Sequence, residues 1–101
     1  MAVKEKRQIR RTTFAKRLRV RPSDRLVQRF VDFPTSRNVT KRDIYFQTQL
    51  SGYFNGMHLF VTFPFDNETD PLQTDYLAEV IRVEALGDCR FGVAVRLIQT
   101  I

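Results

Sequence analysis

Apolar and polar side chains alternate along most of this chain, with the two-residue period that is typical of β-strands. In residues 44–49, for example, Ile44 and Phe46 share one face while Tyr45 and Gln47 share the other. The same pattern predicts strands over residues 14–21, 26–33, 44–49, 57–65, 75–85 and 89–98. No segment has a sustained helical period, so the pattern indicates an all-β domain.

Turn-forming residues separate the predicted strands. Pro22-Ser23-Asp24 follows the first strand, Asn55-Gly56 precedes the fourth, and Gly87-Asp88 predicts a hairpin turn with glycine first. Pro34 has no N–H to donate, so the second strand should be bulged, interrupted or at an edge there. Because 101 residues in six strands leave too little chain for two well-covered sheets, a six-stranded antiparallel β-barrel is favoured over a sandwich.

Composition fits an ordinary globular domain. Hydrophobic residues make up 43% of the sequence, and nine Phe and three Tyr without a Trp suit a β-rich core. The single cysteine, Cys89, excludes an intramolecular disulfide, and we expect it to be a small, partly buried apolar residue. His58 lacks partners for a metal site and is expected to be an ordinary strand side chain. Without paired carboxylates in a plausible cleft, a phosphate loop or metal-ligand spacing, we expect no enzymatic activity, metal or cofactor.

Charge is divided unevenly along the sequence. Residues 1–42 carry fourteen of the seventeen Lys and Arg and a balance of +11, whereas residues 43–101 have a balance of −5. This division suggests an anionic partner near the N-terminal part, such as a nucleotide, nucleic acid or membrane surface. The alternative is that the charges serve only solubility and attraction between the two halves.

Two motifs stand in order ahead of the predicted strands. Arg7-Gln8-Ile9-Arg10-Arg11 has the spacing R-x-x-x-R before the first strand, and Asn38-Val39-Thr40-Lys41-Arg42-Asp43 leads into the third. In this order, on a small β-barrel, they resemble the PilZ family of cyclic di-GMP receptor domains. That family carries R-x-x-x-R in an N-terminal switch segment and (D/N)-x-S-x-x-G at a strand junction. Residues 56–64, 79–83 and 90–95 are similar to PilZ core strands, and the resemblance covers residues ~5–98.

The resemblance implies a basic switch segment of residues 1–13 and a PilZ-like barrel of residues 14–101. The C-terminal helix that family members often carry is not expected here, which is a departure from the family. The resemblance also implies that Arg7 and Arg11 pair with guanine and phosphate, that Asn38 bonds a guanine edge, and that the Thr40 hydroxyl bonds phosphate or base. Arg10, Arg42 and Lys6 would assist at the phosphates. Ligand binding would order the basic segment, which a protein partner of unknown identity would detect.

The second motif departs from the family pattern at two positions. Thr40 replaces serine, which keeps the hydroxyl and adds a methyl group. Asp43 replaces glycine, which could have adopted a positive φ and allowed close approach of a ligand. Aspartate tolerates the left-handed region better than most residues, but its carboxylate would lie near the ligand phosphates or pair with Arg11 in the empty site.

Two other functions compete with a cyclic di-GMP receptor. One is a degenerate PilZ barrel that has lost the nucleotide and serves as a protein-interaction scaffold. The other is a single-stranded nucleic-acid binder that uses the stripe Arg17, Arg19 and Arg21 with Tyr45, Tyr53 and Phe54 as stacking residues, although we expect nucleic acid to be an unlikely partner. Since the first residues lack an apolar signal region and no apolar run could span a membrane, we expect a cytoplasmic protein, monomeric or dimeric through its ligand.

Overall fold

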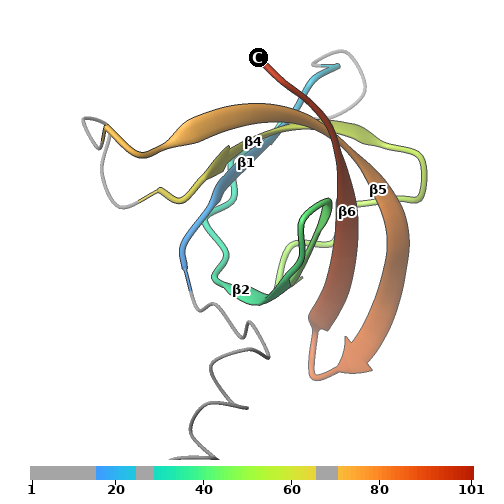
Figure 1. The fold of residues 1–101 in the computed structure, drawn as a ribbon. Helices are drawn as coiled ribbons and strands as arrows, with labels where there is room; N and C mark the ends of the chain where they lie inside the picture. Colours follow the sequence, from blue (N-terminus) through green and yellow to red (C-terminus); the bar gives the residue numbers. More distant parts are fainter. Residues whose placement is uncertain (1–15, 25–28, 66–70) are drawn as a thin grey trace, which may run out of the picture.

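The computed structural model describes residues 16–24, 29–65 and 71–101, which form one six-stranded antiparallel sheet (Figure 1). The strands are β1 (Arg19–Pro22), β2 (Ser36–Val39), β3 (Asp43–Thr48), β4 (His58–Phe63), β5 (Thr74–Gly87) and β6 (Arg90–Thr100). Their order in the sheet is β1-β4-β5-β6-β3-β2. The prediction of an all-β domain with six antiparallel strands is therefore confirmed. No helix in the described part of the chain is long and apolar enough to cross a membrane.

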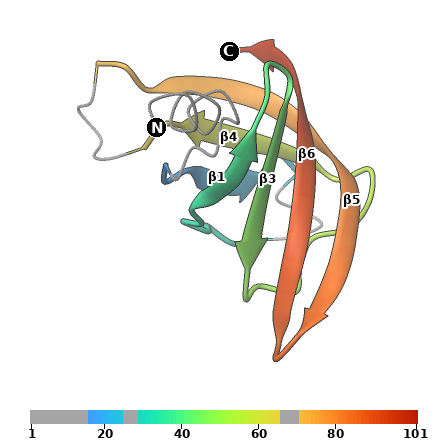
Figure 2. The same cartoon turned by 60° about the horizontal axis from the view of Figure 1, so that its bottom comes forward.

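The sheet curves so that its two ends, β1 and β2, approach each other (Figures 1 and 2). The segment ahead of β2 runs antiparallel to β1, through isolated bridges that join Arg17 to Thr35 and Val20 to Asp32. Main-chain hydrogen bonds from Leu18 N to Pro34 O (2.9 Å) and between Val20 and Asp32 (2.8 Å each way) hold these segments together. β1 and β2 themselves do not pair, so the ladder of strands stays open at this point.

The core lies on the concave face of the sheet, and in β1 and β3 every second residue is buried as the alternation predicts. In β3, Ile44 and Phe46 are fully buried while Tyr45 and Gln47 are half-buried on the other face. The larger cluster includes Leu18, Val20, Leu59, Val61, Val80, Val93 and Val95, which come from β1, β4, β5 and β6 and from the residue ahead of β1. His58 is an exposed β4 side chain, as expected.

The prediction of a strand over residues 26–33 is wrong for residues 29–33, the part of it that the structure describes. Val31 and Phe33 are about half exposed, and Asp32 turns its carboxylate inward to Thr48 and Tyr53. Pro34 interrupts the segment, since it can accept a hydrogen bond from Leu18 but cannot donate one. The strand forms later, at Ser36–Val39, where mostly polar residues pair with β3.

The turn between β5 and β6 is displaced by one residue from the predicted position. Gly87 pairs with Arg90, so Asp88 and Cys89 are the two central residues, and their φ angles are 54° and 59°. Two positive φ angles define a type I′ turn rather than the glycine-first type. A bulge between Ala85 and Gly87 causes this shift, and it leaves Cys89 exposed rather than partly buried as expected.

Candidate functional site

The β2–β3 hairpin carries the second sequence motif, and Thr40 organises its turn. The Thr40 hydroxyl accepts hydrogen bonds from the main-chain N–H of Asp43 (3.0 Å) and of Arg42 (3.3 Å), and it donates to the Asp43 carbonyl (3.4 Å). Thr40 N also donates to that carbonyl at 2.8 Å. Side-chain hydroxyls of this kind replace main-chain bonds in turns. The structure thus places the Thr40 hydroxyl within the turn, with Lys41 and Arg42 exposed at its tip.

Asp43 begins β3, and its carboxylate forms an ion pair with Arg96 of β6, at 3.0 Å between Oδ1 and Nε. The hydrogen bond and the charge of Asp43 raise the pKa of Arg96, which keeps the guanidinium protonated. Among the described residues, the non-glycine positive φ angles belong to Asp88 and Cys89, so Asp43 does not adopt the left-handed conformation considered for it. The glycine of the family pattern is therefore not needed here for backbone conformation.

The remaining predicted ligand-binding residues divide into two groups. Asn38 of β2 and Arg42 of the turn are both exposed on the hairpin. Lys6, Arg7, Arg10 and Arg11 lie outside the described residues. The described chain begins at Lys16, whose main chain bonds to Ser36 at the start of β2: Ser36 N donates to Lys16 O (2.8 Å), and Lys16 N donates to Ser36 Oγ (3.1 Å).

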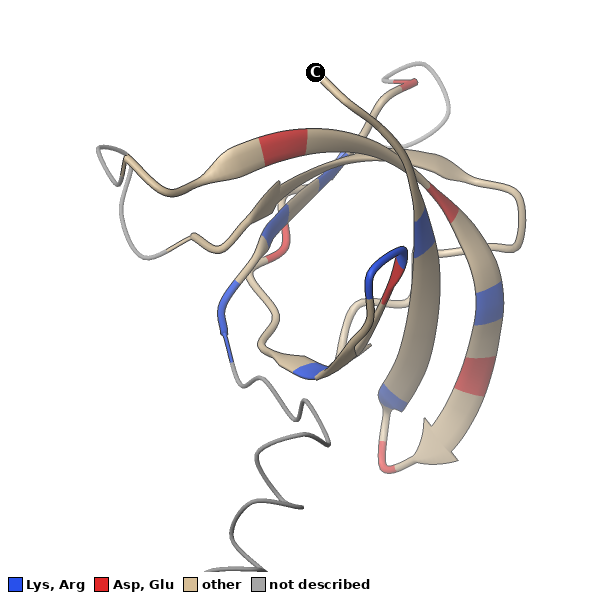
Figure 3. Ribbon diagram, viewed as in Figure 1, with Lys and Arg blue, Asp and Glu red and all other residues tan. Residues whose placement is uncertain are grey.

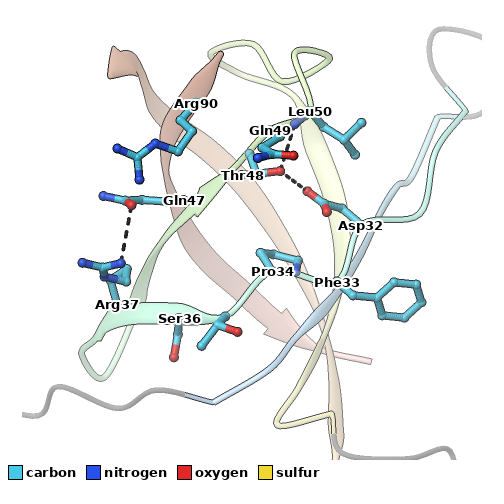
Figure 4. Close-up of a pocket in the computed structure, with 11 residues that line it drawn as sticks. Asp32, Phe33, Pro34, Ser36, Arg37, Gln47, Thr48, Gln49, Leu50 and Arg90 are labelled. Carbon is cyan, nitrogen blue, oxygen red and sulfur yellow. Dashed lines mark hydrogen bonds between the residues drawn. The ribbon is translucent and has the colours of Figure 1, made fainter. Parts of the chain in front are cut away.

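An open cleft of about 930 Å³ lies at the other end of the hairpin, between residues 32–37 and residues 47–50 (Figure 4). It forms where the chain ahead of β2 leaves β3 and crosses to β1. Arg37 and Arg90 flank the Gln47 side chain on one side, and Arg37 Nη1 donates to Gln47 Oε1 at 3.5 Å (Figure 4). Arg37 occupies a bulge of β2, between the paired residues Ser36 and Asn38.

The cleft combines groups that suit a planar, anionic ligand. Two guanidinium groups can bind phosphate or the acceptor edge of a purine, and the side-chain amides of Gln47 and Gln49 add donors and acceptors. Leu50 and Pro34 provide apolar wall. Arg37, Gln47 and Arg90 were not among the predicted site residues. Arg90 in particular joins the cleft only through the pairing of β3 with β6. The sequence offered one indication of this cleft, namely that the basic residue Arg37 directly precedes the second motif.

Two of the three arginines in the basic stripe, Arg19 and Arg21, contact aromatic rings of the domain. The guanidinium groups of Arg19 and Arg21 lie over the rings of Phe65 and Phe60, at 5.1 and 5.2 Å from their centroids. Tyr53, one of the proposed stacking residues, is only 6% exposed. Figure 3 shows basic residues on β1, on the β2–β3 hairpin and on β6, so the positive charge of the described chain is not confined to the stripe.

Comparison with known proteins gives no relatives for this domain. No family model matches the chain, and no curated protein or solved structure matches it either. The assignment of a function therefore depends on the hairpin, the cleft and the sequence motifs.

Thr40→Val is expected to lower the free energy of unfolding by about 1 kcal/mol, because it keeps the shape but removes the hydroxyl that satisfies two turn N–H groups. Thr40→Ser retains the hydroxyl and should stay close to wild type. Urea denaturation of the three proteins measures the difference. Equal stability of the valine and serine variants would show that the hydroxyl does not hold the turn.

Proposed function

We propose that this domain is a receptor for cyclic di-GMP, which binds between the basic N-terminal segment and the β2–β3 hairpin. The observation that carries the proposal is the main-chain pairing of Lys16 with Ser36. It fixes the point where the basic segment joins the domain one residue from Arg37 and two residues from Asn38. The chain that carries the first motif therefore joins the domain at the hairpin that carries the second motif.

Chain length supports this arrangement. Arg11 is five residues from Lys16, and a fully extended chain of that length spans at most about 18 Å. A four-residue strand such as β2 is about 13 Å long. Arg11 is therefore within covalent reach of the turn at one end of the hairpin and of the cleft at the other. Arg7, four residues further along, is also within reach.

The proposed ligand fits the chemistry of these residues. Guanine presents O6 and N7 as adjacent acceptors, which an arginine fork matches with two hydrogen bonds, and arginine also stacks on the purine face. Arg7 and Arg11 would take these roles, with Arg10, Lys6 and Arg42 at the phosphates and Asn38 at a guanine edge. Arg37 and Arg90 extend the positive surface into the cleft, which has room for a base. Fixing residues 1–13 against the hairpin would present a ligand-dependent surface to a partner protein.

The Asp43 carboxylate is the feature least suited to an anionic ligand, and its ion pair with Arg96 reduces the mismatch. Arg96 lies directly opposite Asp43 in the β3–β6 ladder, which holds it beside the hairpin. Asp43→Asn would remove the negative charge and release the Arg96 guanidinium to a phosphate. We therefore expect this variant to bind cyclic di-GMP several-fold more tightly than wild type.

Calorimetric titration with cyclic di-GMP at low salt tests the proposal. We expect wild type to bind with a dissociation constant of about 10 µM or tighter, and Asp43→Asn to bind more tightly still. No heat from either protein at ~100 µM ligand, with both folded by circular dichroism, would overturn the proposal and leave a scaffold barrel. Binding of a random single-stranded oligonucleotide with equal affinity and a steep salt dependence would instead indicate a nucleic-acid binder.

A further inference from the structure

The second half of β5 is the longest stretch of unpaired strand edge in the described part of the chain. β4 pairs with β5 only from Thr74 to Glu79, and Val80 is then held by Gly56 and Met57 through main-chain bonds of 2.8 Å. Residues 82–85 and Gly87 pair with β6 on one side, with bulges at Ile81 and Leu86, and residues 81–87 pair with no described residue on the other side. In Figures 1 and 2 this half of β5 forms the margin of the sheet. Its outward main-chain N–H and C=O groups are free to pair with another strand.

We propose that this edge pairs with the same edge of a second copy of the chain, in an antiparallel ladder centred on Val83. The charges support self-pairing. Arg82 and Glu84 are exposed, flank Val83 at equal distances, and share the face of the sheet on which both contact Tyr45. A twofold axis at Val83 sets Arg82 of each copy opposite Glu84 of the other.

The neighbouring registers are less favourable. A ladder centred on Glu84 would set the two Glu84 side chains against each other, and one centred on Arg82 would do the same with the arginines. In the Val83 register, the half-buried Val83 faces its own copy, and Ile81, which occupies a bulge of β5 and is 39% exposed, lies opposite Ala85. The opposite charges of Arg82 and Glu84 thus favour a second copy of the chain as the partner, and they favour the register centred on Val83.

The bonds that Val80 makes limit the ladder. Leu86 of one copy would lie opposite Val80 of the other, whose edge is already occupied by Gly56 and Met57. The ladder therefore spans residues 81–85 of each chain, and a contact of this size is expected to be weak. β6 and β3 separate this edge from β2 in the sheet, so the turn of the hairpin and the ligand proposed for it are not part of the contact. This dimer would form without ligand.

Charge-reversal variants test the pairing by sedimentation velocity of the full chain up to about 1 mM. The Cys89→Ser background removes disulfide-linked dimers. We expect wild-type charges to give a dimer, and both Arg82→Glu and Glu84→Arg to weaken it at least tenfold. An equimolar mixture of these two variants should dimerise again, because each supplies the charge that the other needs. Arg17→Glu, which makes the same change of net charge as Arg82→Glu but lies ahead of β1, should dimerise like wild type.

A wild-type chain that remains monomeric at the highest concentration, or reversal variants that dimerise as well as wild type, would overturn the proposal. Cross-linking provides a measurement that does not depend on the folding of the reversal variants. In the Cys89→Ser background, Val83→Cys places a thiol at the twofold axis. It should form a disulfide with the same cysteine of the second copy on mild oxidation. A cysteine introduced at the exposed Ile98 of β6 should not. Equal cross-linking at the two positions would contradict the Val83 register.

Discussion

Asp32→Ala is expected to lower the free energy of unfolding by about 3 kcal/mol, because it removes the one acceptor that two buried hydroxyls share. Asp32 Oδ2 accepts from Thr48 Oγ1 at 2.6 Å and from Tyr53 OH at 2.9 Å. Thr48 and Tyr53 are less than a tenth exposed. Burial, the charge of Asp32 and this hydrogen bond all raise the pKa of Tyr53, so its hydroxyl remains a donor. The loss would leave two buried donors without a charged acceptor.

Urea denaturation of a matched series measures this loss. Asp32→Asn keeps one acceptor oxygen and should cost less than the alanine variant, while Thr48→Val and Tyr53→Phe should each cost about 1 kcal/mol by removing one bond. Because Asp32 also lines the cleft, the same series shows whether the cleft depends on this cluster. An alanine variant within ~0.5 kcal/mol of wild type would show that water entering through the cleft replaces the carboxylate.

Arg11→Ala is expected to weaken the binding of cyclic di-GMP at least 100-fold, if Arg11 forms a two-pronged contact with guanine or phosphate as proposed. Two charge-assisted hydrogen bonds of about 1.5 kcal/mol each correspond to a loss of that size. Calorimetric titration of the variant against wild type measures it.

Arg19→Ala is the matched control. It also removes one arginine, but the guanidinium group of Arg19 already contacts other residues of the domain. Arg19 lies over Phe65 and donates to Thr62 Oγ1 at 3.2 Å. We expect less than a threefold change in affinity for this variant. If Arg19→Ala weakened binding as much as Arg11→Ala, the stripe on β1 would be the ligand site and the N-terminal motif would not.

The sequence predicted the fold well where alternation and pairing agree. Ile44 and Phe46 of β3 are buried as their spacing requires, and the most apolar predicted strand became β4. The prediction failed over residues 26–39. Residues 29–33, the described part of a segment with an alternating pattern, do not form a strand, whereas the mostly polar residues 36–39 do. Ser36–Val39 is a strand because β3 offers it a partner, which is information from the tertiary structure rather than from its own residues.

The candidate site was predicted only in part, for the same reason. The motif around Thr40 predicted only the segment that leads into β3, and β2, the other strand of the hairpin, was not predicted. The partner of Asp43 is Arg96, which is 53 residues away and becomes a neighbour only through the pairing of β3 with β6. Arg37 and Arg90 meet at one cleft by the same pairing. Contacts of this kind depend on register, which the period of a single strand does not determine.

The attachment of the N-terminal part to the hairpin has a consequence for how this sequence can change in evolution. The bonds that join β1 and Lys16 to residues 32–36 are mostly between main-chain atoms, which every amino acid except proline can supply in full. Drift at these positions can therefore leave the geometry intact while it erases sequence similarity. The arginines that would touch a nucleotide have no such freedom, because their contribution lies in the side chain. Distant relatives of this chain should then be sought by a few basic positions placed on a shared hairpin.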